Sequence, residues 1–441
     1  MSIAIEQTIH AVQVTLQTVT VGTNIALLHL LWSMLNGSFL LGRGAIFPSL
    51  QLSGFSEDES RRSWSAMRYG VWRIDELVSS WREYVRSEEK WKPNSYEGYR
   101  PIAIDNTIFW RPKLKGWAGK YFNGIANRAS KGVGFALVAE IGEVDGHRIP
   151  LIRTIIRAHP ERMNGKSLKN DALTQVGRNL AEDEIVLHDA GAYISDMQEC
   201  NVPRYVVRLA KNFTARRNYL PESKRGRPRE YGHYVRPLAR TRKGKEIAAT
   251  KPDTETEFTH QGRIIKVHGW RNVVLPGHKV AEEHETFNIW VFFDPLYRNP
   301  LVLGTNVTVL SETTFHLYLD RWPVEQIPLT AKQMIGLHRH FVFAYESCQR
   351  LPELALLAAN ILTYLAAVLP PMPTGFWDRR PKKRQAAFGE SWVRLIFLKK
   401  PLLRGSFGKK GHQPATCQRE FWHIDGKNDI LNLLLGESVV I

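Results

Sequence analysis

Apolar and polar positions follow a helical period in the first part of the chain. Between Ile74 and Val85, apolar residues recur at the i, i+3, i+4, i+7 spacing that is typical of a helix with one buried face. Ser56 and Glu59 form the S-x-x-E pattern of a capping box, which predicts a helix start. Two helices around a short turn at Gly70 suit a helix-turn-helix, and an ordinary helical hairpin fits equally well. We therefore expect an all-α DNA-binding domain in residues 1–95.

From Tyr99 onward the period changes to that of β-strands. Apolar, β-branched runs at Gly134–Ile141 and Arg148–Ile156 flank Asp145-Gly146, which is a hairpin signal. Around this hairpin the pattern predicts, in chain order, a strand with Ile102, Ile104 and Ile108, a helix at Ser167–Leu180, and strands at Ile185–Leu187 and Tyr205–Leu209. Strands separated by a helix in this way predict an α/β fold with a mixed sheet.

The second half of the chain returns to strands and then to helix. Strand-like runs occupy residues 262–268, 287–293 and 301–309, and residues 318–366 are predicted to be largely helical. A Pro-rich break at residues 370–373 leads into a second basic segment.

Charge narrows the class of partner. The 441 residues contain 60 Lys and Arg against 43 Asp and Glu, a net charge of +17. Residues 211–251 alone hold 13 Lys and Arg and three Glu. An excess of this size indicates a polyanionic partner, either nucleic acid or an anionic membrane.

A membrane protein is not what the sequence favours. The run Ile25–Leu35 is eleven residues long, whereas a spanning helix needs roughly 20. The N-terminus has no basic segment before an apolar stretch, so a secretory signal is not expected. Cys200, Cys348 and Cys417 are odd in number and far apart, which argues against a disulfide framework or a zinc site. A nucleic-acid-binding protein of a reducing compartment is the remaining class.

One short segment has the composition of a phosphate-handling site. Tyr318, Arg321, Glu325 and Lys332 have spacings that place them on one face of a continuous helix. Glu325 would hold a metal while the two cations and the phenol grip phosphates beside it. A solvated ion-pair face is the alternative explanation.

Two further carboxylates stand at unusual positions. Asp105 interrupts the apolar strand Ile102–Ile108, and Asp189 follows the apolar strand at Ile185–Leu187. A carboxylate on a buried strand is unfavourable unless it binds a ligand or accepts hydrogen bonds. Two strands and a later helix that each deliver one carboxylate would build a two-metal phosphoryl-transfer site. Oxygen ligands select Mg²⁺, with Mn²⁺ as a substitute.

The same residues carry a family resemblance. Tyr-x2-Arg-x3-Glu-x6-Lys, with Tyr318 as its first residue, resembles the signature of DDE transposases of bacterial insertion sequences, in the type-four group. The stretches AIDNTIF, VLHDAGAY and YLDRWPVEQ are similar, in order, to the three catalytic blocks of that family. The resemblance covers roughly residues 99 to 366.

The resemblance implies a fold and a division of the chain. Asp105, Asp189 and Glu325 would be the catalytic triad of a ribonuclease-H-like domain with a mixed five-stranded sheet and two bound ions. Residues 96–212 and 291–370 would form the two parts of this domain, separated by a basic β-rich insertion at 213–290. Residues 371–441 would be a basic C-terminal segment.

The resemblance also implies an activity. The family nicks each transposon end, forms a hairpin through the freed 3′-hydroxyl, reopens it with water and joins the 3′ ends to target DNA. Tyr318, Arg321 and Lys332 would contact phosphates near the scissile bond. The partners would be double-stranded DNA with terminal inverted repeats, target DNA and a second copy of the chain in an active dimer. The protein would be cytoplasmic, at the bacterial nucleoid.

Some features depart from this picture or leave it open. Pro328 lies within the expected catalytic helix, where it removes a backbone hydrogen bond and is predicted to kink or delay the helix. Members of the family tend to carry a wedge-like Trp on the strand before this helix. In this sequence the matching strand offers Leu301 instead, while Trp290 lies on the preceding strand and Trp322 within the motif.

The segment Lys224-Arg225-Gly226-Arg227-Pro228-Arg229 contains the core of an AT-hook. It fits a minor-groove reader, a general phosphate contact or a solvated loop. Two rival functions also remain open: a nuclease of the same fold that does not join strands, and a catalytically inactive, domesticated DNA-binding protein.

Overall fold

The N-terminal part of the protein is helical throughout. The structure, a computed structural model, describes residues 3–116, 119–220, 229–280 and 285–371. The helices of this part are α1 (Ile3–Thr15), α2 (Thr23–Leu35), α3 (Ser38–Leu41), α4 (Ile46–Leu52), α5 (Glu57–Tyr69) and α6 (Ile74–Ser87). They match the all-α segment that the apolar pattern predicts.

Local sequence signals explain the two best-defined helices. Both hydrogen bonds of the capping box between Ser56 and Glu59 are present at the start of α5, which satisfies backbone donors that have no partner within the helix. On α6, the predicted apolar face is buried, and it packs against α1, α11 (Tyr345–Val368) and the sheet. The consecutive helices α5 and α6 pack on different neighbours, α5 on α2, α4 and α11 and α6 on α1, α11 and β5, so they do not form the closely packed helical hairpin that the sequence allowed. A role for this part of the protein in DNA binding stays a prediction.

A large mixed sheet follows the helices, so the protein has a mixed α/β fold. Its first strands and their connecting helices are, in chain order, β1 (Lys92–Pro93), β2 (Arg100–Trp110), β3 (Gly119–Asn123), β4 (Arg128–Val144), β5 (His147–Arg157), α7 (Gly165–Arg178), β6 (Glu184–His188), α8 (Ile194–Glu199) and β7 (Tyr205–Arg208). β2, β4 and β5 pair antiparallel, whereas β6 lies parallel to both β2 and β7.

The predicted hairpin is formed by β4 and β5. Asp145 and Gly146 occupy its turn with φ angles of 48° and 78°. Two consecutive positive φ angles are the geometry of the tight turn whose twist matches that of antiparallel strands, and Asp-Gly is one of the sequences that adopt it readily. The hairpin was therefore predictable from a dipeptide and its apolar flanks.

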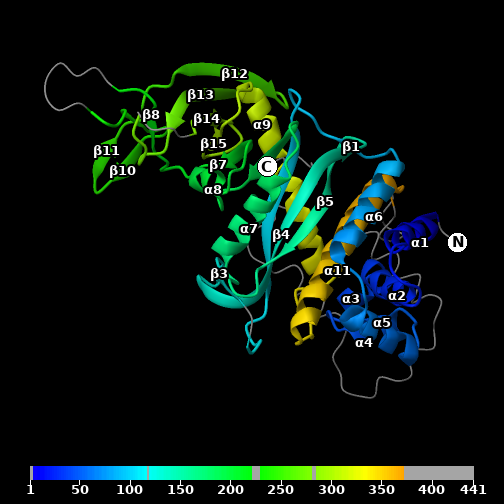
Figure 1. Cartoon of the computed structure of the whole chain (residues 1–441). Coiled ribbons are helices and arrows are strands. Elements are labelled where there is room, and N and C mark those ends of the chain that lie inside the picture. Colours follow the sequence, from blue (N-terminus) through cyan, green and yellow to red (C-terminus); the bar gives the residue numbers. More distant parts are fainter. Residues whose placement is uncertain (1–2, 117–118, 221–228, 281–284, 372–441) are drawn as a thin grey trace.

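The inserted segment extends the same sheet. The predicted insertion at 213–290 contains β8 (Ala215–Arg217), β9 (Tyr234–Val235), β10 (Arg240–Arg242), β11 (Lys245–Ile247), β12 (Thr254–His260) and β13 (Arg263–Val274). β14 (Phe287–Phe293) crosses its predicted end, and β15 (Leu301–Thr305) belongs to the predicted second catalytic part. β15 pairs with β7, and β14 and β13 follow, so thirteen strands of the described residues form one sheet. A sheet of five strands was expected, and the difference arises because β15 adds directly to the open edge of β7. Figure 1 shows the added strands extending to one side of the central sheet.

Helices cover both faces of the central strands. Apolar residues of α7 and α8 pack on the face that carries Ile102 and Ile104 of β2. The opposite face, with Ala103 and Phe109, packs on α11 and the N-terminal helices (Figure 1). Asn360 of α11 joins the layers, because its Oδ1 accepts from Trp81 Nε1 at 2.9 Å and from the Ile152 amide at 3.1 Å. The N-terminal helices and the sheet are thus parts of one packed core.

Helix α11 is the longest helix of the described residues and contains an extended apolar stretch. By length and composition alone, this helix could cross a membrane. The run Ile25–Leu35, considered above, is too short to do so. Its apolar window is almost completely buried between the sheet and the N-terminal helices. Such burial is typical of a core helix in a globular protein.

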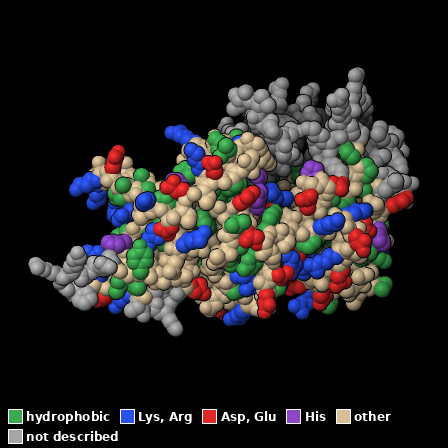
Figure 2. Space-filling model, turned by 90° about the horizontal axis from the view of Figure 1, so that it is seen from above, with side chains coloured by type: hydrophobic (Ala, Val, Ile, Leu, Met, Phe, Trp, Pro, Cys, Tyr) green, Lys and Arg blue, Asp and Glu red, His purple; other side chains and the backbone are tan. Residues whose placement is uncertain are grey.

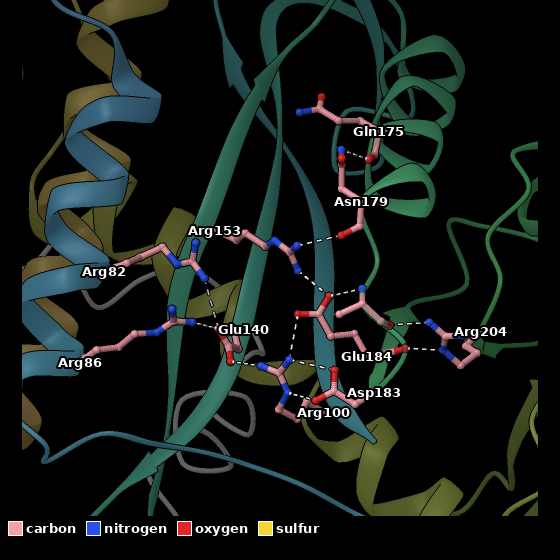
Figure 3. Close-up of polar contacts among 11 residues, drawn as sticks. Arg82, Arg86, Arg100, Glu140, Arg153, Gln175, Asn179, Asp183, Glu184 and Arg204 are labelled. Atoms are coloured by element: carbon pink, nitrogen blue, oxygen red, sulfur yellow. Dashed lines mark hydrogen bonds and ion pairs between the residues drawn. The ribbon is translucent and has the colours of Figure 1, made fainter. Parts of the chain in front are cut away.

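Many of the cations in the described residues are paired with acids. Figure 2 shows Lys and Arg side chains lying among Asp and Glu over one face of the molecule. In Figure 3, the buried carboxylate of Glu140 on β4 forms ion pairs with Arg82 and Arg86 of α6 and with Arg100 of β2. Arg100 also pairs with Asp183 at 2.6 Å. Because Glu140 is only 2% exposed, this network ties α6 to the central strands.

Candidate active site

Two of the predicted acids lie on or directly after adjacent parallel strands, Asp105 on β2 and Asp189 immediately after β6. Ala103 of β2 pairs with Leu187 of β6, and Asp105 and Asp189 each follow two residues later. Residues in register on neighbouring strands point to the same face of the sheet. Side chains alternate between the two faces along β2. Because Ile102 and Ile104 are buried on one face, the carboxylates of Asp105 and Asp189 point to the opposite face.

The third acid arrives on a segment that crosses this face. α9 (Ser311–Leu319) is followed by a 3₁₀ turn at Trp322–Glu325, α10 (Gln326–Leu329) and a π-helical turn at Thr330–Met334. The 3₁₀ turn lies against β2, β4 and β5. Glu325 thereby lies close enough to Asp105 for the two carboxylates to interact electrostatically. The negative charges of Glu325 and Asp189 both oppose the ionisation of Asp105. The structure thus brings the three predicted acids together.

The segment from Tyr318 to Lys332 is not one continuous helix: an interruption was predicted from Pro328, but the chain already leaves the α-helix after Leu319, before either proline. α9 ends where the fully buried Asp320 pairs with Arg148 of β5 at 2.6 Å and accepts from Asn94 at 2.7 Å. Beyond this point, Pro323 and Pro328 lack the amide hydrogens that a regular helix needs. The helix type consequently changes three times over a short distance, and such π-helical turns often occur at functional sites.

Arg321 lies between two of the acids. Its Nη2 donates to Glu325 Oε1, and its Nη1 lies 4.0 Å from Asp189 Oδ2. The side chain is buried, and its guanidinium carbon lies 4.7 Å from the centre of the Trp322 ring. Within the described residues, Nε and Nη1 of Arg321 have no hydrogen-bond acceptor. A buried guanidinium with unused donors is suited to receive an anionic oxygen.

The two strand carboxylates have opposite electrostatic environments. Burial, followed by the charge of Glu325, raises the pKa of Asp105 to about 7, and Asp189 adds to the effect. Burial also acts on Asp189, but hydrogen bonding and charge from His188, the Gly191 amide and Arg321 outweigh it, so the pKa of Asp189 lies well below its ordinary value. His188 Nδ1 and the Gly191 nitrogen lie 3.0 Å and 2.8 Å from Asp189 Oδ1. Separated pKa values of this kind cluster at functional sites.

Lys332 extends the site along β2. Its Nζ donates to Thr107 Oγ1 at 2.7 Å and lies 5.2 Å from the centre of the Phe109 ring. Burial lowers the pKa of Lys332 to about 8, although the charge of Asp105 acts in the opposite direction. Lys332 is therefore held two residues beyond Asp105, on the same face of the sheet.

The remaining predicted site residues have different surroundings. Tyr318 is buried among apolar side chains of α9 and the sheet, and burial raises the pKa of its hydroxyl despite the charges of Arg321 and Arg208. Lys224, Arg225 and Arg227 lie outside the described residues. Arg229 is exposed and lines a hollow in the inserted strands together with Arg216, so it is not part of the carboxylate cluster.

Several residues of the site were not predicted. Thr107 lies two positions after Asp105, and period-two alternation alone would have placed it on the same face. Asn94 and Arg148 hold Asp320 from distant parts of the sequence. No local pattern signals such pairs.

The acids are of the right chemical type for a hard divalent cation. Carboxylate oxygens are the ligands that Mg²⁺ and Mn²⁺ take in proteins, and the raised pKa of Asp105 marks a repulsion that such an ion would relieve. Among the described residues, however, no group of three His, Cys, Asp or Glu side chains lies close enough to hold a metal ion. In this conformation the guanidinium of Arg321 supplies the positive charge between Glu325 and Asp189.

Comparison with known proteins adds no relative to this picture. No protein-family model matches the chain, and no curated protein matches it. The function is therefore argued from the geometry of this site and the spacing of its residues.

Proposed function

We propose that this protein is a DDE transposase that cleaves transposon ends by metal-dependent phosphoryl transfer and joins their 3′ ends to target DNA. The observation that carries the proposal is the convergence of Asp105, Asp189 and Glu325 on one face of the sheet, with Arg321 between two of them. Three carboxylates on a strand, a strand end and a later helical turn would supply the ligands of a two-ion phosphoryl-transfer site, after a closer approach than in this conformation, in which no three such groups of the described residues lie close enough to hold an ion.

The fold assignment is part of the proposal. We infer that β5, β4, β2, β6 and β7 are the five strands of a ribonuclease-H-like sheet, interrupted after β7 by the inserted strands. The support is their adjacent order in the sheet, with the antiparallel strands β5, β4 and β2 followed by parallel β6 and β7. The connection between the paired parallel strands β6 and β7 crosses over through α8, and the connection from β5 to β6 contains α7.

Each residue of the site has a role in this scheme. The three carboxylates would hold Mg²⁺ or Mn²⁺, which would activate the attacking oxygen and stabilise the leaving one. Arg321 has buried donors without acceptors among the described residues, and these would receive a phosphate oxygen. Lys332, fixed by Thr107, would place a second cation near the same phosphate. Catalysis would rest on positioning and charge neutralisation.

The proposal extends to partners. Double-stranded DNA with terminal inverted repeats and a target DNA are the substrates, and a dimer would hold two ends together. The basic residues 211–251 support a DNA partner, because Lys and Arg gain affinity by releasing counterions from the phosphate backbone. Action at the bacterial nucleoid follows from such substrates.

Cleavage of DNA tests the proposal directly. Linear DNA that carries the flanks of the coding region would be incubated with the protein and Mg²⁺. Asp105→Asn, Asp189→Asn and Glu325→Gln should each abolish nicking while DNA binding in EDTA persists. Asp171→Asn, on the surface of α7 beside Arg162, is the matched control and should cleave normally.

The same experiment separates the rival functions. Cleavage without strand-transfer products would support the nuclease. Undiminished nicking by all three acid variants would remove the assigned site, and DNA binding without any metal-dependent cleavage by the native protein would favour the domesticated DNA-binding protein.

A further inference from the structure

We propose that the inserted strands carry a binding site for unpaired DNA bases, built from Tyr231 and Tyr234 on a framework of arginines. The site is a hollow of about 380 Å³ lined by Arg216, Arg229, Glu230, Tyr231, Gly232, His233 and Tyr234. We call it the tyrosine hollow. It lies at the end of the sheet, where β9 pairs with β8, far along the strand order from the carboxylates.

The two aromatic rings are accessible. Tyr231 is 36% exposed and Tyr234 is 44% exposed. Between them, Gly232 is buried against β8, and a Cβ added at this position would lie 2.0 Å from the backbone oxygen of Arg217. The absence of a side chain therefore lets the chain pass close to β8 while the flanking tyrosines remain at the surface.

A fixed arginine supports both rings. The guanidinium carbon of Arg216 lies 3.9 Å from the centre of the Tyr234 ring and 4.9 Å from that of Tyr231. Its Nε and Nη1 donate to the carbonyl oxygens of Pro276 and Gly232, both at 2.8 Å. Arg236 contributes a second guanidinium 5.0 Å from the Tyr234 ring. The rings are therefore held in place before any ligand arrives, which limits the entropy lost on binding.

The chemistry of the hollow favours a nucleotide. Exposed aromatic rings among cations are the arrangement on which bases stack while phosphates meet arginine. Its single carboxylate, Glu230, lies 3.2 Å from Lys279 Nζ, so it does not leave the hollow with a net negative charge. The faces of bases are covered by neighbours in a duplex, whereas unpaired bases expose them. The preferred ligand should accordingly be a single-stranded segment of DNA.

This inference rests on the proposed DNA-processing function, since a hairpin formed at a cleaved end cannot keep the bases at its tip paired. Its test is nevertheless independent of the carboxylates. A fluorescent single-stranded oligothymidine and a duplex of equal length would be titrated with the full chain in EDTA, and binding followed by anisotropy. Tyr231→Ala combined with Tyr234→Ala should weaken single-strand binding by roughly tenfold or more and change duplex binding less than twofold.

Two controls make the result decisive. Tyr297→Ala removes an equally exposed tyrosine, 50% accessible, from the loop after β14, and should leave both affinities unchanged. Tyr231→Phe with Tyr234→Phe keeps the rings and should retain single-strand affinity. Equal loss for both DNA forms, loss in the Phe variant, or no loss in the Ala variant would each overturn the inference. Because no metal is present, failure of the cleavage proposal would appear only in the nicking assay.

Discussion

Asp320, the residue directly before Arg321, is fully buried and forms an ion pair with Arg148 of β5. This ion pair ends α9 and fixes the direction in which Arg321 and Glu325 enter the site. Arg148 is partly exposed, whereas Asp320 is not. Removing the arginine and removing the carboxylate should therefore have different energetic consequences. Without Arg148, the carboxylate of Asp320 stays buried and keeps only the neutral side chains of Asn94 and Tyr96 as hydrogen-bond partners. Without the carboxylate, the arginine can turn to water.

The first prediction follows from this asymmetry. Arg148→Ala should lower the free energy of unfolding by about 2–3 kcal/mol, because an uncompensated buried charge is strongly destabilising. Asp320→Asn should be milder, and adding it to Arg148→Ala should restore part of the lost stability. Urea denaturation of the two single variants and the double variant measures the coupling. Strictly additive effects would show that the ion pair does not hold this segment.

The second prediction concerns pH. Burial and the neighbouring acids raise the pKa of Asp105 to about 7, so between about pH 4 and 7 the folded protein keeps a proton that the unfolded chain releases. Stability without metal must therefore fall as the pH rises through this window, by at most about 4 kcal/mol. The shift for Asp189 is downward, so its effect lies at more acidic pH and has the opposite sign.

Asp105→Asn removes this dependence. Thermal melts in EDTA should show the variant gaining stability over the native protein as the pH rises from 4 to 8, with the two alike near pH 4. Parallel melting curves across that range would mean that the Asp105 carboxyl is not under strain from its neighbours.

The third prediction is that divalent cations relieve the same repulsion. Millimolar Mg²⁺ or Mn²⁺ at pH 8 should raise the melting temperature of the native protein by roughly 2–5 °C. Asp105→Asn, Asp189→Asn and Glu325→Gln should each lose this increase, while Asp171→Asn keeps it. A metal-induced increase that survives in all three site variants would place the ion elsewhere in the protein.

Local signals made some of the structure predictable from the sequence. The capping box at Ser56, the apolar face of α6 and the turn at Asp145-Gly146 each depend on residues within a few positions of one another. The proximity of Asp105 and Asp189 was also predictable, because one acid interrupts an apolar strand, the other follows one, and the two strands were expected to be neighbours. Short-range periodicity therefore placed two of the three acids.

The rest depends on contacts between distant residues. The joining of β15 to β7 turned the expected separate insertion into a continuation of the sheet, and no residue of β15 signals its partner. The two prolines around Glu325 signal an irregular helix locally, but the end of α9 at Asp320 depends on Arg148, far away in the sequence. Tertiary packing overrides helical spacing here, so the four motif residues do not share a continuous helical face.

The fourth prediction concerns the joint between the N-terminal helices and the sheet. Asn360 is fully buried in α11, where it accepts from Trp81 of α6 and from the Ile152 amide, and donates to the carbonyl of Pro150 at 2.6 Å. Asn360→Ala would leave all three groups buried without a partner and should lower the free energy of unfolding by about 3 kcal/mol or more. Trp81→Phe removes one donor and leaves Asn360 bonded to β5, so we expect a smaller loss. If the two variants are equally destabilised in urea, the stability of the joint comes from the packing of Trp81 and not from the amide of Asn360.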